Sequence, residues 1–272
     1  MGFTVTSLAS GSSGNALLVE RAGQALLIDC GVALRTIDQL LRYRGVAPDS
    51  IRALLLTHEH GDHTLSAAAL ARRYGVPIVC NAATHAALGC DIAGLVEVLP
   101  VGERASIAAF DVSSFRVRHD AADAVGYRVS ADGATLALAV DLGSWDATTV
   151  DALHAADLLV VEANHDRELL RASRYPWALQ QRICGPLGHL DNIQCGELLA
   201  RSGVCSDQEV WLAHLSEQTN SARQAVAGVR RVLEIAGQPN VSLRALPRRS
   251  LNAPGGAPMW QSDTRLLQQR MF

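Results

Sequence analysis

The stretch that decides the fold and chemistry of this chain is Ala53-Leu54-Leu55-Leu56-Thr57-His58-Glu59-His60-Gly61-Asp62-His63, in which three histidines and two acids follow an apolar run. Leu54–Leu56 indicates a short buried strand, and a helix is expected to begin near Leu65. The polar side chains would then lie at the carboxyl edge of a sheet. Because imidazole and carboxylate groups suit zinc, manganese or iron, the stretch predicts a metal site.

The number of donors in this stretch predicts two ions, because one ion needs only three or four protein ligands. The candidates are His58, His60, Asp62 and His63. In an extended turn, the alternate residues His58 and His60 project to one side. Asp62 and His63 can then reach a second ion, while Glu59 points away. Surface histidines, or a His-Glu pair that supports another structure, are the alternative, but only 9 of 272 residues are histidine, so chance clustering is rare.

Composition indicates an ordered globular protein of one large domain or two modest ones, with 49% hydrophobic and 19% charged residues among 272. The formal charge of −3 gives no general attraction to nucleic acid or membranes, so an anionic substrate has to be attracted by a local patch or by the metal ions. The six cysteines form no Cys-x-x-Cys pair, which predicts reduced, mostly buried thiols. Met1–Leu8 lacks a signal-peptide pattern, and no apolar stretch approaches the ~20 residues of a membrane span. We therefore expect a cytoplasmic protein without membrane contact.

The N-terminal segment predicts an antiparallel sheet. Its strands are expected at Thr4–Leu8, Ala16–Glu20 and Ala25–Asp29. The Ser10–Asn15 loop could offer backbone N–H groups to a phosphate, and its Ser12 is a candidate substrate contact; an ordinary tight connection explains the loop equally well. Asp29 ends the third strand, where its carboxylate would either accept a hydrogen bond from a ligating histidine or cap a turn.

The middle of the chain predicts helices followed by a second sheet. Helices are expected at Ile37–Arg44, Ser66–Tyr74 and Ala82–Leu88, with a short strand at Pro77–Cys80. The second sheet is expected from strands at Leu95–Leu99, Ala105–Ala108, Val112–Val117, Val125–Val129 and Thr135–Val140.

The last third predicts alternating strands and helices. Strands are expected at Leu158–Val161, Val210–Ala213 and Val241–Leu246, and helices around Arg167–Leu170, Trp177–Ile183, Gln194–Ser202 and Ala222–Ile235. Because nothing before residue 247 resembles a linker, we expect one catalytic domain over 1–247 and a loosely ordered tail over 248–272.

Polar residues follow several of these strands, where further ligands belong. His119 and Asp141 each end an expected strand of the second sheet, and His214 follows an apolar strand just as His58 does. Glu162 follows another strand, and His189 precedes a helix. Each alone would be an ordinary polar residue at the end of an element. Together with the cluster at 58–63, they predict one larger metal site.

The ordered set His58-x-His60-x-Asp62-His63, His119, Asp141, His189 and His214 resembles the metallo-β-lactamase superfamily over nearly the whole chain. The resemblance implies an α/β (α+β) fold, the four-layer αβ/βα sandwich in which two mixed β-sheets face each other and helices cover the outer faces. Further segments resemble the bacterial YycJ/WalJ subgroup, which is related to phosphoribosyl cyclic phosphodiesterases and tRNase Z. These segments are Leu8–Asn15, His119–Tyr127, Asp141–Gly143, Glu162–Asp166, Arg174–Trp177 and Gly188–Asn192.

The same resemblance implies the ligands of a two-metal centre. By it, His58, His60 and His119 would hold one ion, Asp62, His63 and His214 the second, and Asp141 would bridge the two. The ions would be Zn²⁺ or Mn²⁺, with iron as a further option. A bridging carboxylate can hold two cations at the ~3.5–4 Å spacing used in two-metal hydrolysis, which makes a bridging hydroxide available at neutral pH.

The candidate catalytic residues are Asp62, His189 and Glu162. His189 and Glu162 match positions of the phosphodiesterase branch, where a histidine near the leaving oxygen could donate a proton or hold a non-bridging oxygen. A histidine that only caps and packs is the alternative. His165 is a candidate substrate contact, whereas His85 and His154 are expected to be structural or exposed.

A basic segment with aromatic residues could contact a polyanionic strand. It contains Arg167, Arg171, Arg174 and Arg182, interleaved with Tyr175 and Trp177. A solvated helix face explains these charges equally well. Arg174 is the candidate substrate contact within the segment.

These residues predict a metal-dependent hydrolase, the family resemblance implies that it is dinuclear and cleaves phosphodiester bonds, and the subgroup resemblance implies a DNA 5′-exonuclease. A small cyclic phosphodiester is the first alternative substrate. Thioester or lactam hydrolysis is a weaker alternative, because it leaves Glu162 and His189 without a role. A metal-stabilised regulatory binding protein without turnover is the alternative outside enzymes. A homodimer is the default expectation for assembly.

Overall fold

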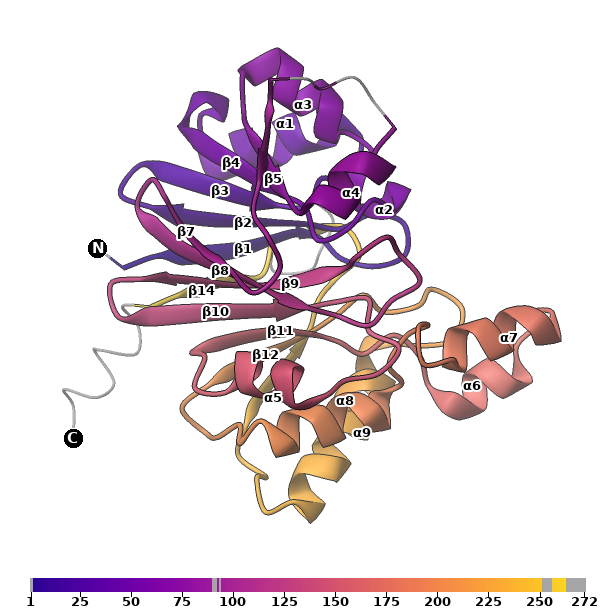
Figure 1. The fold of residues 1–272 in the computed structure, drawn as a ribbon. Coiled ribbons are helices and arrows are strands. Elements are labelled where there is room, and N and C mark those ends of the chain that lie inside the picture. The colour runs from indigo at the N-terminus through magenta and orange to yellow at the C-terminus, as the bar shows by residue number, and fades with distance from the viewer. Residues whose placement is uncertain (1, 90–91, 93, 251–255, 263–272) are drawn as a thin grey trace, which may run out of the picture.

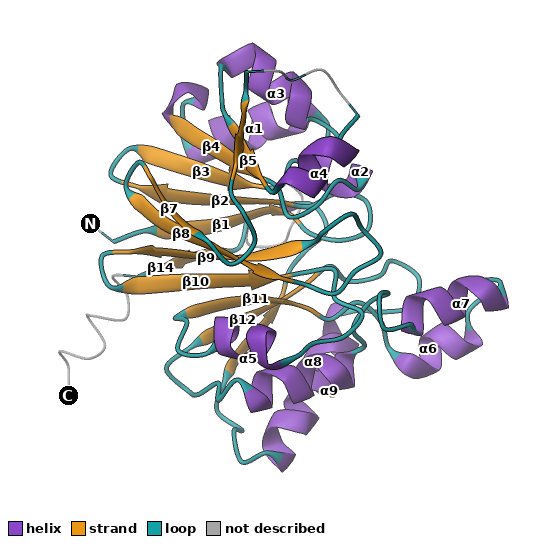
Figure 2. Ribbon diagram, in the orientation of Figure 1, coloured by secondary structure: helices purple, strands orange, loops and turns teal. Residues whose placement is uncertain are grey.

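The computed structural model describes residues 2–89, 92, 94–250 and 256–262. Within them, two seven-stranded mixed sheets lie face to face, and Figure 1 shows helices α1 (Leu34–Arg44) and α3 (Ala67–Tyr74) outside one sheet and α5 (Ala147–Leu153), α8 (Asn192–Arg201) and α9 (Ala222–Ile235) outside the other. Figure 2 shows the same layering by secondary structure. The predicted four-layer αβ/βα sandwich is confirmed.

The first sheet has the order β14-β1-β2-β3-β4-β5-β6. Its strands are β1 (Thr4–Ala9), β2 (Ala16–Arg21), β3 (Gln24–Ile28), β4 (Ile51–Leu55), β5 (Ile78–Cys80), β6 (Val96–Val98) and β14 (Met259–Gln261). Strands β1 to β3 are antiparallel, as predicted, and β3 to β6 are parallel. The prediction that the strand near Leu95 opens the second sheet is wrong: β6 pairs in parallel with β5, because helix α4 (Ala82–Ala87) carries the chain back to the same sheet.

Part of the C-terminal tail belongs to the first sheet. Strand β14 pairs antiparallel with β1, with Trp260 opposite Val5, so residues 259–261 form an edge strand rather than loosely ordered chain. Tail residues 251–255 and 263–272, like Cys90, lie outside the described residues. The domain boundary at residue 247 stays a prediction.

The second sheet has the order β13-β12-β11-β10-β9-β8-β7. Its strands are β7 (Arg104–Ile107), β8 (Phe110–Arg116), β9 (Val125–Ala131), β10 (Ala134–Ala139), β11 (Leu158–Glu162), β12 (Glu209–Ala213) and β13 (Ser242–Ala245). Strands β10 to β13 are parallel, so their carboxyl ends meet at one edge. Residues that follow different strands are thereby brought together.

Three further helices lie among the described residues. They are α2 (Gly61–Thr64), α6 (Arg167–Ala172) and α7 (Trp177–Cys184), with a 3-10 turn at Pro48–Ser50. The helix expected at Ser66–Tyr74 is confirmed as α3, but the separate helix α2 was not predicted, so Asp62 and His63 lie on a short helical turn rather than an extended one. Helix α5 was not predicted; the Asp146 carboxylate caps it by accepting from Thr149 N.

The core between the sheets is filled by side chains that alternate along the strands. Val5 and Leu26 of the first sheet join Val129 and Trp211 of the second in one buried cluster. Tyr127 is fully buried there, and its hydroxyl donates to Leu56 O at 2.7 Å, which ties the two sheets together beside the 58–63 stretch.

Two further predictions concern membrane contact and cysteines. Among the described residues, no helix combines the length and the apolar character that a membrane span requires. The five described cysteines are free thiols, of which Cys184 and Cys205 are exposed and the other three are buried.

Candidate metal centre

The predicted ligands converge at one edge of the sandwich. His58 and His60 follow β4, Asp62 and His63 lie on α2, and His119, Asp141 and His214 follow β8, β10 and β12. Their ligand atoms form overlapping groups: His58, His60 and His119; His58, His63 and Asp141; Asp62, His63 and His214; and Asp141, Glu162, His189 and His214. In each group the ligand atoms lie within 4.8 Å of one another, a separation that one cation can span.

The first group consists of three imidazoles. The ring centroids of His58 and His60 are 4.6 Å apart, and each lies 5.1 Å from His119. His119 Nδ1 lies 3.1 Å from Gly188 O, so it donates there and leaves the Nε2 lone pair for a cation. His58 Nδ1 contacts Thr57 Oγ1 at 3.1 Å, while its Nε2 is buried without a hydrogen-bond partner among the described residues.

The second group combines imidazoles with a carboxylate. Asp62 Oδ2 lies 3.6 Å from His63 Nε2 and 3.4 Å from His214 Nε2. Asp141 Oδ2 lies 2.8 Å from His63 Nε2 but is not in hydrogen-bond geometry with it. His58 Nε2 and Asp141 Oδ2 are buried without a hydrogen-bond partner among the described residues, which suits a shared cation, so the residues present fit divalent metal ions.

Two carboxylates orient the ligating histidines from behind. Asp29 Oδ2 accepts from His63 Nδ1 at 2.7 Å, which is the first of the two roles expected for Asp29. Glu162 Oε1 lies 2.8 Å from both His214 Nδ1 and His189 Nδ1, and its Oε2 accepts from the backbone N–H groups of Leu142 and Leu190. Glu162 is fully buried, and its carboxylate is engaged by these histidines and backbone N–H groups.

Electrostatics distinguishes the two groups. Burial lowers the pKa of His58 well below its usual range, and the neighbouring His63 adds to the effect, which favours a neutral imidazole at His58. Burial also opposes the charge on His63, but the carboxylates of Asp29 and Asp141 outweigh it and raise the pKa of His63 to about 10. The carboxylates around His63 therefore favour a positive charge there, and a divalent cation would compete with the proton for that position.

Backbone conformation at the centre is constrained. Asp29, Asp141 and His214 have φ of 59°, 56° and 54°, the left-handed region that non-glycine residues rarely occupy. Each follows a strand at the edge where the ligands meet, and such strain concentrates at functional sites. Gly31 approaches the turn closely, since a Cβ atom there would lie 1.6 Å from Asp62 O.

Comparison with known proteins assigns the family. The sequence model described as the metallo-beta-lactamase superfamily matches residues 9–180. The chain belongs to the metallo-β-lactamase superfamily. It is 35% identical over 226 residues to the exodeoxyribonuclease WalJ of Streptococcus pneumoniae serotype 2 (strain D39), covering 81% of this chain and 84% of that relative.

Two further similarities extend this result. The exodeoxyribonuclease YycJ of Bacillus anthracis is 34% identical over 243 residues, covering 87% of this chain and 91% of the relative. The crystal structure of the metallo-β-lactamase-fold protein YhfI from Bacillus subtilis superimposes with a TM-score of 0.73 at 17% identity, covering 96% of this chain and 100% of that one. The second similarity concerns the fold alone.

One residue at this metallo-β-lactamase centre was not singled out from the sequence. Asn15 Nδ2 lies 3.0 Å from His63 Nε2, and its backbone N–H donates to Asp62 O at 2.8 Å. The Ser10–Asn15 loop therefore braces the metal-binding turn. The Gly/Ser loop was noticed in the sequence, but the role of Asn15 could not be predicted from it. An asparagine at the end of such a loop has many local uses, and its partner His63 lies 48 residues away.

The other candidate residues lie at different distances from the centre. Ser12 and His189 line the same cavity, of about 220 Å³, together with Tyr175 and Arg182. His165 is only 1% exposed and contacts Cys184 Sγ at 3.9 Å, outside the ligand groups. Of the histidines expected to be structural or exposed, His154 contacts Ser202 O at 3.0 Å and His85 is exposed on α4.

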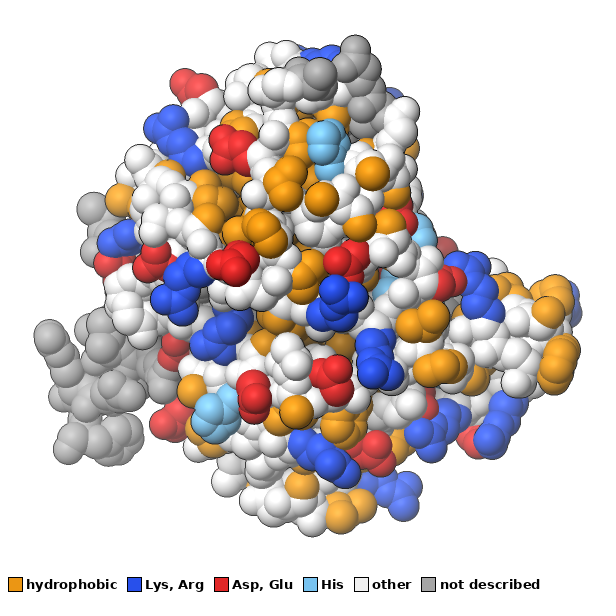
Figure 3. All heavy atoms as spheres, viewed as in Figure 1, with side chains coloured by type: hydrophobic (Ala, Val, Ile, Leu, Met, Phe, Trp, Pro, Cys, Tyr) orange, Lys and Arg blue, Asp and Glu red, His pale blue; other side chains and the backbone are white. Residues whose placement is uncertain are grey.

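The basic segment forms a projecting arm, residues 167–184 with helices α6 and α7 (Figure 1). Most of its arginines pair with acids: Arg167 with Asp191, Arg171 with Glu168, and Arg182 with Asp120. Arg174 is exposed and forms no ion pair with the described residues, and Trp177 is 75% exposed. Figure 3 shows charges of both signs intermixed over this face, so the arm is no single-sign patch.

Proposed function

We propose that this chain is a metal-dependent exodeoxyribonuclease that hydrolyses DNA from a 5′ end, using two divalent ions. The observation that carries the proposal is a set of four overlapping ligand groups, two of which share Asp141, next to a cavity that His189 lines. The similarity of 34–35% to proteins named exodeoxyribonucleases WalJ and YycJ supports DNA as the substrate.

Hydrolysis of a phosphodiester forms one bond from phosphorus to water and breaks one to a sugar oxygen, which takes up a proton. Divalent ions, when bound, neutralise the phosphoryl oxygens and lower the pKa of water. His58, His60 and His119 would hold one ion and Asp62, His63 and His214 would hold the other, and Asp141, which shares a further group with His58 and His63, would supply an additional carboxylate.

His189 is positioned to handle the leaving oxygen. Its Nδ1 is held by Glu162 Oε1 at 2.8 Å, its side chain is 22% exposed, and it lines the cavity with Ser12. The other ring nitrogen is thereby available to donate a proton to the leaving oxygen or to bind a phosphoryl oxygen. Glu162 is a positioning residue that keeps His189 and His214 in place.

Arg182 connects the arm to this cavity. Its guanidinium lies 2.6 Å from Asp120, whose other carboxylate oxygen is 3.3 Å from His119 Nε2. Tyr175 lines the same cavity from the connection between α6 and α7. We propose that the arm contacts the strand next to the scissile phosphate through Tyr175 and Arg174. The expected cytoplasmic location and homodimer stay predictions.

The test is a cleavage assay with Mn²⁺ or Zn²⁺ on DNA labelled at either the 5′ or the 3′ end. A 5′-exonuclease releases the 5′ label at once as a short product, whereas the 3′-labelled strand shortens progressively. Asp141→Ala should abolish both patterns, and His85→Ala, an exposed histidine away from the ligand groups, should retain them. A chelator should stop the reaction, and added metal should restore it.

Two results would overturn the proposal. One is cleavage of a cyclic ribose phosphate with no cleavage of DNA, which would assign the centre to a small substrate. The other is equal turnover of every phosphodiester by wild type and Asp141→Ala, which would remove the centre from the reaction.

A further inference from the structure

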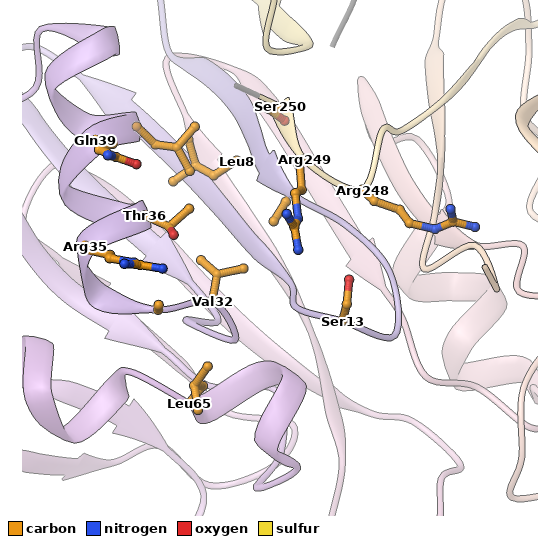
Figure 4. Close-up of a pocket in the computed structure, with 13 residues that line it drawn as sticks. Leu8, Ser13, Val32, Arg35, Thr36, Gln39, Leu65, Arg248, Arg249 and Ser250 are labelled. Atoms are coloured by element: carbon orange, nitrogen blue, oxygen red, sulfur yellow. The ribbon is translucent and has the colours of Figure 1, made fainter. Parts of the chain in front are cut away.

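A second hollow lies next to the metal centre and shares a wall with it. Ser12 lines the cavity beside His189, whereas the next residue, Ser13, lines a separate cavity of about 390 Å³ (Figure 4). The Ser10–Asn15 loop therefore faces the metal centre on one side and this hollow on the other. Leu65, directly after the metal-binding helix α2, lines the hollow and is 66% exposed.

The hollow combines an apolar floor with two exposed arginine side chains. Leu8, Val32 and Leu40 form apolar parts of its lining. Arg35, from the first turn of α1, and Arg249 extend into it from opposite sides (Figure 4). Both are exposed, and neither guanidinium forms a hydrogen bond or ion pair with the described residues; among those residues, no acidic side chain lines the hollow.

The segment that carries Arg249 is anchored. Arg248 points away from the hollow, and its Nη2 donates to Ser216 O at 2.9 Å. Ser10 N donates to Arg248 O at 3.4 Å, Arg249 forms a β-bridge with Ala9, and the Ser250 hydroxyl donates to Ser7 O. The Arg249 backbone is therefore fixed against β1, so less conformational entropy is lost when a ligand binds.

We propose that this hollow binds a phosphorylated nucleotide, with the phosphate between Arg35 and Arg249 and the sugar or base on the apolar floor. Guanidinium groups suit phosphate because each can donate two parallel hydrogen bonds to it. A volume of about 390 Å³ lies within the range of small-molecule pockets and exceeds what a phosphate ion alone would fill.

The ligand can come from two sources with the same chemistry. One is a nucleotide of the DNA strand whose neighbour lies at the metal centre, and this form rests on the proposed function. The other is a free nucleotide, such as a product of the reaction. The DNA strand is the favoured source of the ligand. The Ser10–Asn15 loop lines both cavities, so a DNA strand that crosses this loop reaches both.

The test compares Arg35→Gln and Arg249→Gln with Arg52→Gln in the metal-loaded, full-length protein. Arg52 is a matched control, because it is exposed near the start of β4, at the opposite end from His58. Calorimetry with thymidine 5′-monophosphate should show affinity lowered about tenfold in either hollow variant and unchanged in the control. Thymidine, which lacks the phosphate, should bind weakly to all of them.

Salt dependence separates the two sources. For single-stranded DNA, the slope of log affinity against log salt concentration should fall by about 0.7 for each phosphate that the variant no longer neutralises. Bis-p-nitrophenyl phosphate is too short to reach both cavities. In the Arg35→Gln and Arg249→Gln variants, the ratio of kcat/KM on DNA to kcat/KM on this compound should also fall about tenfold. Weaker mononucleotide binding without these changes would assign the hollow to a free nucleotide.

The inference is overturned if both hollow variants bind the mononucleotide and DNA with the affinity and salt slope of Arg52→Gln. If the proposed nuclease function is wrong but the hollow binds a nucleotide, the experiments give a different result. In that case wild type cleaves no DNA, while the mononucleotide still distinguishes the hollow variants from the control.

Discussion

The two sheets supply the metal centre in different ways. The first sheet contributes His58, His60, Asp62 and His63 from one short turn after β4. The second sheet contributes one residue from the end of each of three strands, which are far apart in the sequence. The turn can be recognised as a linear motif, whereas the second contribution exists only because those strands end at one edge. Substitutions on either side can show whether the two contributions depend on each other.

Asp141 joins the two contributions, so its removal should have the largest effect. Its Oδ2 lies 2.8 Å from His63 Nε2 of the turn, and its Oδ1 lies 3.3 Å from His214 Nδ1 of the second sheet. We expect Asp141→Ala to lower kcat/KM by about 10³-fold, since it weakens charge stabilisation at both groups. Metal content per chain, measured by plasma mass spectrometry, should fall as well. Full metal content with near wild-type turnover would remove Asp141 from the centre.

The two carboxylates that accept hydrogen bonds from the histidines, Glu162 and Asp29, should differ in how much they contribute to metal affinity. Glu162→Gln and Asp29→Asn keep shape but weaken the hold on ligating histidines, and such changes lower metal affinity about 10- to 100-fold. The loss should be larger for Glu162, which contacts two histidines and two backbone N–H groups, than for Asp29, which contacts His63 and Thr57. Competition with a chromophoric chelator measures the affinity. A larger loss at Asp29 would mean that the turn, and not the second sheet, controls metal binding.

Close backbone packing on both sides of the centre should affect the free energy of unfolding. A Cβ at Gly31 would lie 1.6 Å from Asp62 O, and one at Gly143 would lie 2.3 Å from Gly188 N. We expect Gly31→Ala and Gly143→Ala each to lower the free energy of unfolding by about 1–3 kcal/mol, the usual cost of overpacking. Gly61→Ala is the control, because nothing lies within 4 Å of its Cβ position. Urea unfolding that gives the same midpoint for all three would show that the turn has room to move.

The smallest effect should come from the hydrogen bond between the sheets. Tyr127→Phe removes the hydroxyl that donates to Leu56 O and leaves a buried carbonyl without that partner. We expect a loss of about 1 kcal/mol in the free energy of unfolding. Tyr43→Phe serves as control, because Tyr43 is 62% exposed. An unchanged stability for Tyr127→Phe would indicate that water or a backbone shift satisfies Leu56 O.

Much of the fold could be predicted because its periodicities are strong. The apolar runs of β4, β10 and β12 and the spacing in α9 mark buried elements directly. Helix α5 was missed because the segment that begins at its capping residue Asp146 shows little apolar periodicity. The position of β6 was missed because a short strand carries no information about which sheet it joins.

The sequence by itself determined which residues could bind metal: a turn with four donors in six positions needs no distant information, and polar residues after apolar strands indicate further ligands. The tertiary structure alone decided that Glu162 stands behind His189 and His214, that Asn15 braces His63, and that Arg35 and Arg249 face one hollow. Those relations depend on where strands end and which loops meet. A linear pattern does not encode them, because the contacts join residues that only the packing of two sheets brings together.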